Sequence, residues 1–232
     1  GILAGVDIAR KVFQKFDPSL KMTEYISDGA HVRPGDIAFV VEGPVRSLLQ
    51  TERIMLNIMQ RMSGVATMTD RYQQRLAGLK TKVLDTRKTT PGMRLLEKEA
   101  VKIGGGSNHR IGLFDMILIK DNHVDFAGGI PQAVAAAKKW CADNGKNLQI
   151  ELEVRNTEEI DQALAAGVDR IMLDNFTPAR TMEAVKHIRA YKAPDAQLQA
   201  DSHVHNGTDV EIESSGGITL DTLRDYGEGG VD

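Results

Sequence analysis

Short apolar runs alternate with amphipathic stretches along the chain from about residue 81 onward. Five of these runs have the length and composition of β-strands: residues 83–87, 116–120, 148–154, 170–174 and 210–214. Between them, apolar residues recur three and four positions apart, which predicts helices over residues 131–143, 157–166 and 178–191. Thr177 before Pro178 is a helix-start signal, and Gly145 and Gly167 follow the ends of two helices. This order predicts an α/β fold with a parallel sheet, as a (β/α) barrel or an open version of one.

The first 50 residues have a different texture. Between residues 35 and 44, apolar residues alternate with glycine and proline turns, which predicts a small β-rich subdomain. A helix is predicted from Thr51 to about Leu76, with a core-filling row of methionines. These methionines are Met55, Met59, Met62 and Met68.

Residues 192–209 are polar and have no periodicity. We expect an inserted surface loop there, in which His203 and His205 are exposed to solvent rather than bound to a metal.

Composition excludes several classes of protein. Hydrophobic residues make up 41% and charged residues 26% of the 232 residues, as in ordinary globular proteins. No apolar run reaches the roughly 18 residues that span a bilayer, and we expect a cytoplasmic protein with no membrane partner. The single cysteine, Cys141, excludes an intrachain disulfide framework and is expected to pack within a helix.

Positive charge is concentrated in one part of the chain. The net charge is −3, yet residues 71–120 hold eleven Lys or Arg residues against four acidic ones, a local excess of seven positive charges. A nucleic-acid surface would add stacking aromatic residues, but these are only 5% of the chain. We therefore expect a small polyanionic ligand and no nucleic-acid partner.

Polar residues follow the predicted strands where each strand ends. They are Arg87 and Lys88, then Lys120, Glu153 and Asp174, and finally Ser215, Gly216 and Gly217. The carboxyl ends of parallel barrel strands open on one face, so these side chains should meet there. The cations suit carboxylate or phosphate groups, and two carboxylates on adjacent strands suit Mg²⁺.

Motifs along nearly the whole chain resemble the quinolinate phosphoribosyltransferase family. They are Thr51-Glu52-Arg53, Ser63-Gly64-Val65-Ala66-Thr67, Asp85-Thr86-Arg87-Lys88-Thr89-Thr90-Pro91-Gly92, Asn108-His109-Arg110, Ile119-Lys120-Asp121-Asn122-His123, Glu151-Leu152-Glu153-Val154, Met172-Leu173-Asp174-Asn175-Phe176 and Ser215-Gly216-Gly217-Ile218. The resemblance implies an N-terminal α/β sandwich, partly present in residues 1–55, and an open, incomplete α/β barrel in residues 56–232. It also implies that quinolinate attacks the anomeric carbon of phosphoribosyl pyrophosphate in NAD biosynthesis, giving nicotinate mononucleotide, pyrophosphate and CO₂.

The resemblance also implies a role for each site residue. Quinolinate would lie among Thr86, Arg87, His109, Arg110 and Lys120, with Arg53 donated by the other subunit of a homodimer. The phosphoribosyl donor and Mg²⁺ would face Lys88, Glu153 and Asp174, with water between the metal and the two carboxylates. The backbone N–H groups of Ser215, Gly216 and Gly217 would bind the sugar phosphate.

Two departures from the family pattern leave alternatives open. The chain begins inside the usual N-terminal domain and stops before a further barrel strand, so it resembles a fragment with residues 210–214 at a sheet edge. A related-fold transferase of molybdenum transport loci is one alternative, and a truncated, non-catalytic anion-binding scaffold is another.

Three other acidic residues have simpler interpretations. Only one of Glu151 and Glu153 is expected to face inward, which would leave Glu151 for packing or a surface ion pair. Asp85 and Asp121 are expected to support the neighbouring cations rather than to bind ligands. Arg53 could also simply cap or pair on its own helix.

Overall fold

The protein divides into two compact units, each described here by itself. The structure, a computed structural model, describes residues 1–194, 203 and 205–232. The first unit comprises Gly1–Ala77 and Lys82–Ile111, and the second comprises Gly78–Thr81 and Gly112–Asp232.

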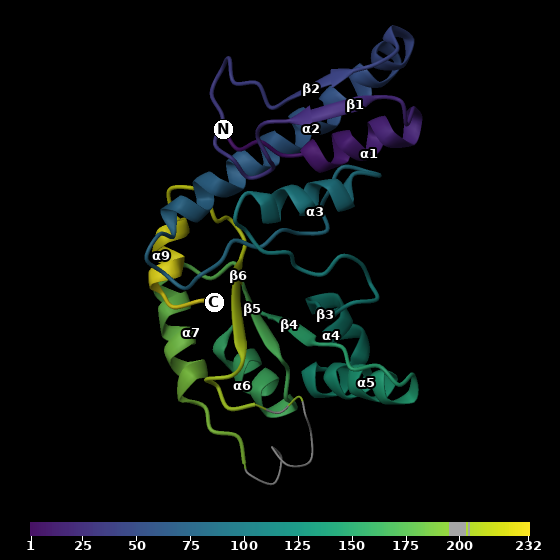
Figure 1. Cartoon of the computed structure of the whole chain (residues 1–232). Helices are drawn as coiled ribbons and strands as arrows, with labels where there is room; N and C mark the ends of the chain where they lie inside the picture. The colour runs from purple at the N-terminus through teal and green to yellow at the C-terminus, as the bar shows by residue number, and fades with distance from the viewer. Residues whose placement is uncertain (195–202, 204) are drawn as a thin grey trace. The chain divides into compact units, whose positions relative to one another are not determined.

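A long helix forms the spine of the first unit (Figure 1). The elements of this unit are α1 (Val6–Phe16), β1 (Lys21–Glu24), β2 (Phe39–Glu42), α2 (Val45–Arg75) and α3 (Arg94–Ile103). Strands β1 and β2 form an antiparallel pair. Met55 and Met59 of α2 pack in one apolar cluster with Phe13 of α1, and Met62 packs in a second cluster with Ala100 of α3. Helix α2 thus contributes to both small cores.

The predicted β-structure between residues 35 and 44 is confirmed by β2, which pairs with β1, but the region as a whole is not β-rich because α1 and the start of α2 occupy much of it. Val6, Ala9 and Phe13 are buried on one face of α1 at the three- and four-residue spacing of a helix. The methionine prediction is confirmed at three positions, but Met68 is 48% exposed because it lies off the buried face of α2.

Residues 83–87 do not form a strand, contrary to the prediction. Leu84 and Ser107 form an isolated parallel bridge, in which Ser107 donates to the Val83 carbonyl at 2.8 Å and Asp85 donates to the Ser107 carbonyl at 3.2 Å. A single partner residue fixes the segment locally, and the chain bends at Arg87.

A parallel sheet forms the centre of the second unit, in the order β3-β4-β5-β6 (Figure 1). Its strands are β3 (Ile117–Ile119), β4 (Ile150–Val154), β5 (Arg170–Asp174) and β6 (Glu211–Ser215). Its helices are α4 (Asp121–Ala127), α5 (Ile130–Asp143), α6 (Thr157–Ala166), α7 (Pro178–Ala190) and α9 (Leu223–Glu228). The α/β prediction is therefore confirmed, and the sheet is open, with β3 and β6 at its edges among the described residues.

Helix-end signals in the second unit act as predicted. The Thr177 hydroxyl accepts a hydrogen bond from the Arg180 N–H at 3.3 Å, and Gly167 ends α6 in a left-handed conformation with φ 70°. Cys141 is buried in α5, as expected.

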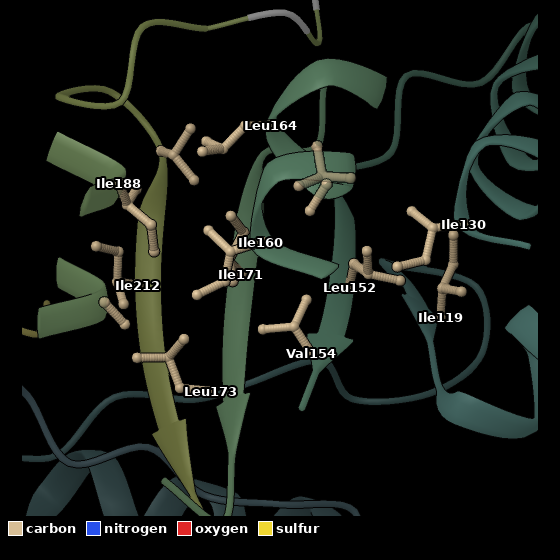
Figure 2. Packing of buried hydrophobic residues seen from close by; sticks show 14 of the residues in the cluster. Ile119, Ile130, Leu152, Val154, Ile160, Leu164, Ile171, Leu173, Ile188 and Ile212 are labelled. Carbon is tan, nitrogen blue, oxygen red and sulfur yellow. The ribbon is translucent and has the colours of Figure 1, made fainter. Parts of the chain in front are cut away.

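One face of the sheet carries the main hydrophobic core (Figure 2). Leu152, Ile171 and Ile212, on three adjacent strands, are at most 1% exposed. They belong to one apolar cluster with Ile160 of α6 and Ile188 of α7. Burying a side chain of this size stabilises the fold by about 1.5–3 kcal/mol, so this face fixes the strand register.

The other face of the sheet is polar. Glu151 pairs in register with Arg170, and Glu153 pairs with Met172. The expectation that only one of the two glutamates faces inward is wrong, because residues two apart on a strand share a face. Glu151 is completely buried, so a surface ion pair is also excluded for it.

His203 and His205 are partly buried, contrary to the predicted exposure. Their ring nitrogens lie 2.9 and 3.1 Å from the carboxylate of Asp169, and their side chains are 13% and 29% exposed. The same carboxylate accepts the Ile150 N–H at 2.7 Å, at the start of β4. The rest of the predicted loop is described at residues 192–194 and 205–209, whereas residues 195–202 and 204 lie outside the described residues.

A membrane-crossing helix was not expected from the sequence. Among the described residues, each helix is too short or too polar to cross a bilayer.

Candidate functional site

Lys120 and Glu153 meet at the carboxyl end of the parallel sheet in the second unit. Lys120 directly follows β3 and precedes the first turn of α4. Its Nζ lies 3.0 Å from Glu153 Oε2, and its side chain is 45% exposed against 13% for Glu153. The register of β3 beside β4 therefore brings together a cation and a carboxylate that lie 33 positions apart in the sequence.

A tight pair of turns follows β5 and β6 at the same end of the sheet. The Asn175 amide nitrogen donates to Asp174 Oδ2 at 2.8 Å, and the Asn175 N–H donates to the Ser215 carbonyl at 2.8 Å. Gly216 has φ 97°, and a Cβ on it would lie 2.2 Å from Asn175 Oδ1. Asn175 itself has φ 55°, so both turns use left-handed backbone and Gly216 leaves no room for a side chain.

Arg170 connects carboxylates on the polar face of the sheet. Its Nε donates to Glu211 at 2.8 Å, and its Nη1 lies 3.5 Å from Glu213. Burial of the guanidinium would lower the pKa of Arg170, but the hydrogen bond to Glu211 and the surrounding carboxylates raise it. On this polar face, Arg170 of β5 thus links the carboxylates of the neighbouring strand β6 into one charged network.

In the first unit, the predicted cations Arg87 and Lys88 lie on a loop whose turn is fixed locally. The Thr86 hydroxyl accepts the Lys88 N–H at 3.0 Å, while Lys88 itself is exposed and Arg87 is half-buried. The Arg94 guanidinium of α3 donates to the Arg87 carbonyl at 3.4 Å and to the Ile111 carbonyl at 3.2 Å. Arg53 lies exposed on α2.

An open depression with a volume of about 520 Å³ lies beside this loop. It is lined by Thr89, Thr90, Pro91, Gly92, Arg94 and Leu95.

A buried network holds His109 in the first unit. The Lys98 ammonium pairs with the Asp85 carboxylate and donates to the His109 carbonyl at 2.8 Å. Asp85 Oδ1 also accepts the His109 N–H at 2.9 Å. His109 Nδ1 accepts the Arg110 N–H at 2.8 Å, so the neutral ring carries its proton on Nε2.

Asn108 completes this network. With its amide nitrogen directed at its two acceptors, it donates to Asp85 Oδ2 at 2.7 Å and to the Lys98 carbonyl at 2.8 Å. Asp85 does pair with a cation, but this cation is Lys98 of α3 and not one of the neighbouring cations that the sequence suggested.

Sequence reasoning missed the residues of α3 that hold these loops. Arg94, Glu97 and Lys98 lie three and four positions apart, and Glu97 and Lys98 are buried. The apolar residues of 94–103 recur at helical spacing, which would have predicted this helix, but this pattern does not show that Glu97 and Lys98 are buried.

Glu97 is held ionised by the first unit. Burial raises its pKa, but hydrogen bonds from Thr90 and from Arg61, together with the Arg61 charge, lower the pKa below its ordinary value of about 4.5. The Arg61 Nε lies 2.8 Å from Oε1, and the Thr90 N–H lies 3.1 Å from Oε2.

Replacing Glu97 with glutamine is expected to lower the free energy of unfolding at pH 7 by about 1.5–3 kcal/mol. Because the folded pKa lies below the unfolded one, the ionised carboxylate stabilises the fold above about pH 4.5, and this stabilisation is lost as the pH falls through the folded value. Urea unfolding of both proteins between pH 7 and pH 3 measures the difference. A difference that stays constant over this range would contradict the prediction.

Both parts of the chain match known sequence families. Residues 1–63 match the N-terminal domain of quinolinate phosphoribosyl transferase, and residues 65–232 match its C-terminal domain. Chloroplastic nicotinate-nucleotide pyrophosphorylase (carboxylating) from Oryza sativa subsp. japonica is 40% identical, over 100% of this chain and 61% of its own. A probable nicotinate-nucleotide pyrophosphorylase (carboxylating) from Synechocystis sp. is 39% identical, over 100% of this chain and 72% of its own.

Solved structures agree with these sequence matches. The nicotinate-nucleotide pyrophosphorylase from Francisella tularensis is 41% identical and superposes with a TM-score of 0.85, over 100% of this chain and 75% of that one. The chain spans about 61–65% of the length of the first plant relatives that it matches. The chain belongs to the quinolinate phosphoribosyl transferase family.

Proposed function

We propose that the protein transfers the phosphoribosyl group of phosphoribosyl pyrophosphate to quinolinate, with loss of CO₂, to give nicotinate mononucleotide and pyrophosphate. The observation that carries this proposal is the ion pair of Lys120 with Glu153, at the sheet end that also bears Asp174. A cation for an acidic substrate and two carboxylates for a metal-bound donor come from adjacent strands. The match to both domains of the family supports the same reaction.

Quinolinate is a dianion and needs several fixed cations. Arg87, Arg110 and Lys120 bind its two carboxylates, Thr86 contributes its hydroxyl, and His109 donates from Nε2. The Arg110 N–H bond to His109 Nδ1 supports this assignment, because it leaves the ring proton on Nε2. The set of Arg87, His109, Arg110 and Lys120 suits a dicarboxylate better than the anion of a molybdenum-transport transferase.

The phosphoribosyl donor is bound by Lys88, Glu153 and Asp174. A pair of carboxylates with room for waters and substrate phosphates is the donor set that Mg²⁺ prefers, so these residues fit that ion. Bound Mg²⁺ would neutralise charge on the departing pyrophosphate. Backbone N–H groups of the turn after β6 bind the sugar phosphate, at residues Ser215, Gly216 and Gly217.

The reaction needs alignment more than a dedicated base. The pyridine nitrogen is held against the anomeric carbon, which can contribute about 7–11 kcal/mol when the geometry is good. As the C–N bond forms and the C–O bond to pyrophosphate breaks, Lys88 stabilises the leaving group. The ring nitrogen is then cationic and stabilises the carbanion that remains on the ring when CO₂ departs. This carbanion takes a proton from water. His109 therefore orients the substrate and removes no proton.

An assay of the purified 232-residue chain tests this function. The chain is mixed with quinolinate, phosphoribosyl pyrophosphate and Mg²⁺, and the loss of quinolinate is measured together with the nicotinate mononucleotide formed. Reactions with nicotinate in place of quinolinate, or with a chelator, are the controls. Turnover of quinolinate alone, abolished by the chelator, is the expected result. Binding of quinolinate without turnover would support an anion-binding scaffold, and no binding would contradict the proposal.

The proposal includes a homodimer in which Arg53 reaches the site of the partner. The exposed position of Arg53 on α2 is compatible with this role. The cytoplasmic location predicted from the sequence stays a prediction.

Mixing Arg53→Ala chains with Lys120→Met chains is expected to restore activity that neither variant has alone. In each heterodimer, one site then combines an intact Lys120 with the intact Arg53 of the other chain, so random pairing restores about a quarter of all sites. Activity is measured after denaturing and refolding the mixture, with heterodimers verified by differential tags. Verified heterodimers without activity would show that each chain uses its own Arg53.

A further inference from the structure

One charged pair of the first unit is almost completely buried and has no place in the reaction described above. The side chains of Lys98 and Asp85 are 3% and 7% exposed. Removing two charges from water is costly, and a pair of apolar residues commonly stabilises a core as well or better. The pair therefore suggests a role besides stability.

Among the described residues, the side chains of this pair make their further hydrogen bonds to Asn108 and His109. Lys98 donates to the carbonyl of His109, and Asp85 accepts the N–H of the same residue. The amide nitrogen of Asn108 donates to the second oxygen of Asp85. The backbone of His109 is thus held on both sides by one ion pair.

These contacts of Lys98 and Asp85 with Asn108 and with the backbone of residue 109, here called the clamp, also affect the ring of His109. A backbone fixed at 109 sets where the Arg110 N–H points, and this N–H binds the ring at Nδ1. Position, ring orientation and tautomer of His109 all follow from contacts of the segment that the ion pair holds.

We propose that Lys98 and Asp85 are positioning residues for quinolinate, acting through His109 and Arg110. The proposal rests on the function proposed above. Neither residue touches the substrate; together they hold the backbone that presents one ring N–H and one guanidinium to a carboxylate. Quinolinate binding should therefore depend on the pair, whereas binding of the phosphoribosyl donor should not.

The test compares three variants of the whole chain. Lys98→Met removes the cation and leaves a buried carboxylate, so it is expected to fold poorly. The double variant Lys98→Met/Asp85→Asn removes both charges and keeps similar shapes, so it avoids the buried lone charge. Lys102→Met is the matched control on the same helix, because Lys102 forms an exposed ion pair with Glu99 at 2.7 Å.

Calorimetry measures the Kd for quinolinate and for phosphoribosyl pyrophosphate with Mg²⁺, and circular dichroism checks the fold. The double variant is expected to bind quinolinate on the order of 10- to 100-fold more weakly and the donor within about threefold of the original affinity. Lys102→Met should change neither. Nitrogen NMR of His109 should show the Nε2–H tautomer in the original chain and a mixture in the double variant.

A folded double variant with unchanged quinolinate affinity and an unchanged His109 tautomer would overturn the proposal. An equal loss for both ligands would overturn it too, because it would indicate a general loss of structure. If the double variant fails to fold, Asn108→Ala, which removes one clamp bond, must weaken quinolinate binding alone for the proposal to stand. If the original chain binds the donor but no quinolinate, the proposed function fails first, and this result differs from a failure of positioning.

Discussion

Replacing Lys120 with methionine is expected to lower kcat/KM for quinolinate by about 10²–10³-fold. Methionine keeps most of the side-chain volume but removes the ammonium, which is the one proposed quinolinate ligand in the second unit. A charge-assisted hydrogen bond to a carboxylate is lost, and Glu153 loses its partner at 3.0 Å. Steady-state kinetics with quinolinate varied at saturating donor measures the effect.

Two comparisons separate the roles of Lys120. Lys139→Met is the matched control in the same unit, because Lys139 forms an exposed pair with Asp143 at 2.7 Å. Adding Glu153→Gln to both backgrounds completes a double-mutant cycle. Additive losses would indicate that Lys120 acts on the substrate, whereas a Glu153→Gln change that costs nothing further would indicate that it acts through Glu153. An unchanged kcat/KM in Lys120→Met would remove this residue from the site.

Asp174→Asn is expected to lower kcat by about 10²-fold and to raise the Mg²⁺ concentration needed for half-maximal rate. Asparagine keeps the shape and an oxygen that can accept from Asn175, but it loses the charge that attracts the metal. Rates are measured over a Mg²⁺ titration at saturating substrates.

The control for this second change is Asp121→Asn. Asp121 directly follows the residue after β3 at the same end of the sheet, and its carboxylate accepts the Asn122 N–H at 2.6 Å. A normal Mg²⁺ dependence in Asp174→Asn, or an equal loss in Asp121→Asn, would contradict a metal role for Asp174.

Much of the second unit could be predicted from the sequence because its signals are local. Helix α6 and strand β5 have the predicted boundaries, since Gly167 ends one and the buried run 171–173 defines the other. The strand prediction for residues 83–87 was wrong because strand-like composition requires a partner strand, and among the described residues Leu84 has only an isolated bridge to Ser107. Pairing depends on distant residues that a local pattern does not show.

The candidate site could be predicted by residue type but not by contact. Lys120 and Glu153 were assigned to different substrates, and only the β3–β4 register places them 3.0 Å apart. Lys98 could not be distinguished from a surface lysine, because its burial depends on Asp85 and His109, which come from separate loops. The prediction that Glu151 and Glu153 face opposite ways was avoidable, because residues two apart on a strand share a face and this rule needs only the sequence.

The contact between Gly216 and Asn175 links two loops that are separate in sequence. A Cβ at position 216 would lie only 2.2 Å from Asn175 Oδ1, so the Asn175 side chain occupies the space that a side chain at 216 would need. The choice of amino acid at 216 is therefore dictated by a neighbouring turn before any ligand is considered. Anyone redesigning either loop has to rebuild both together.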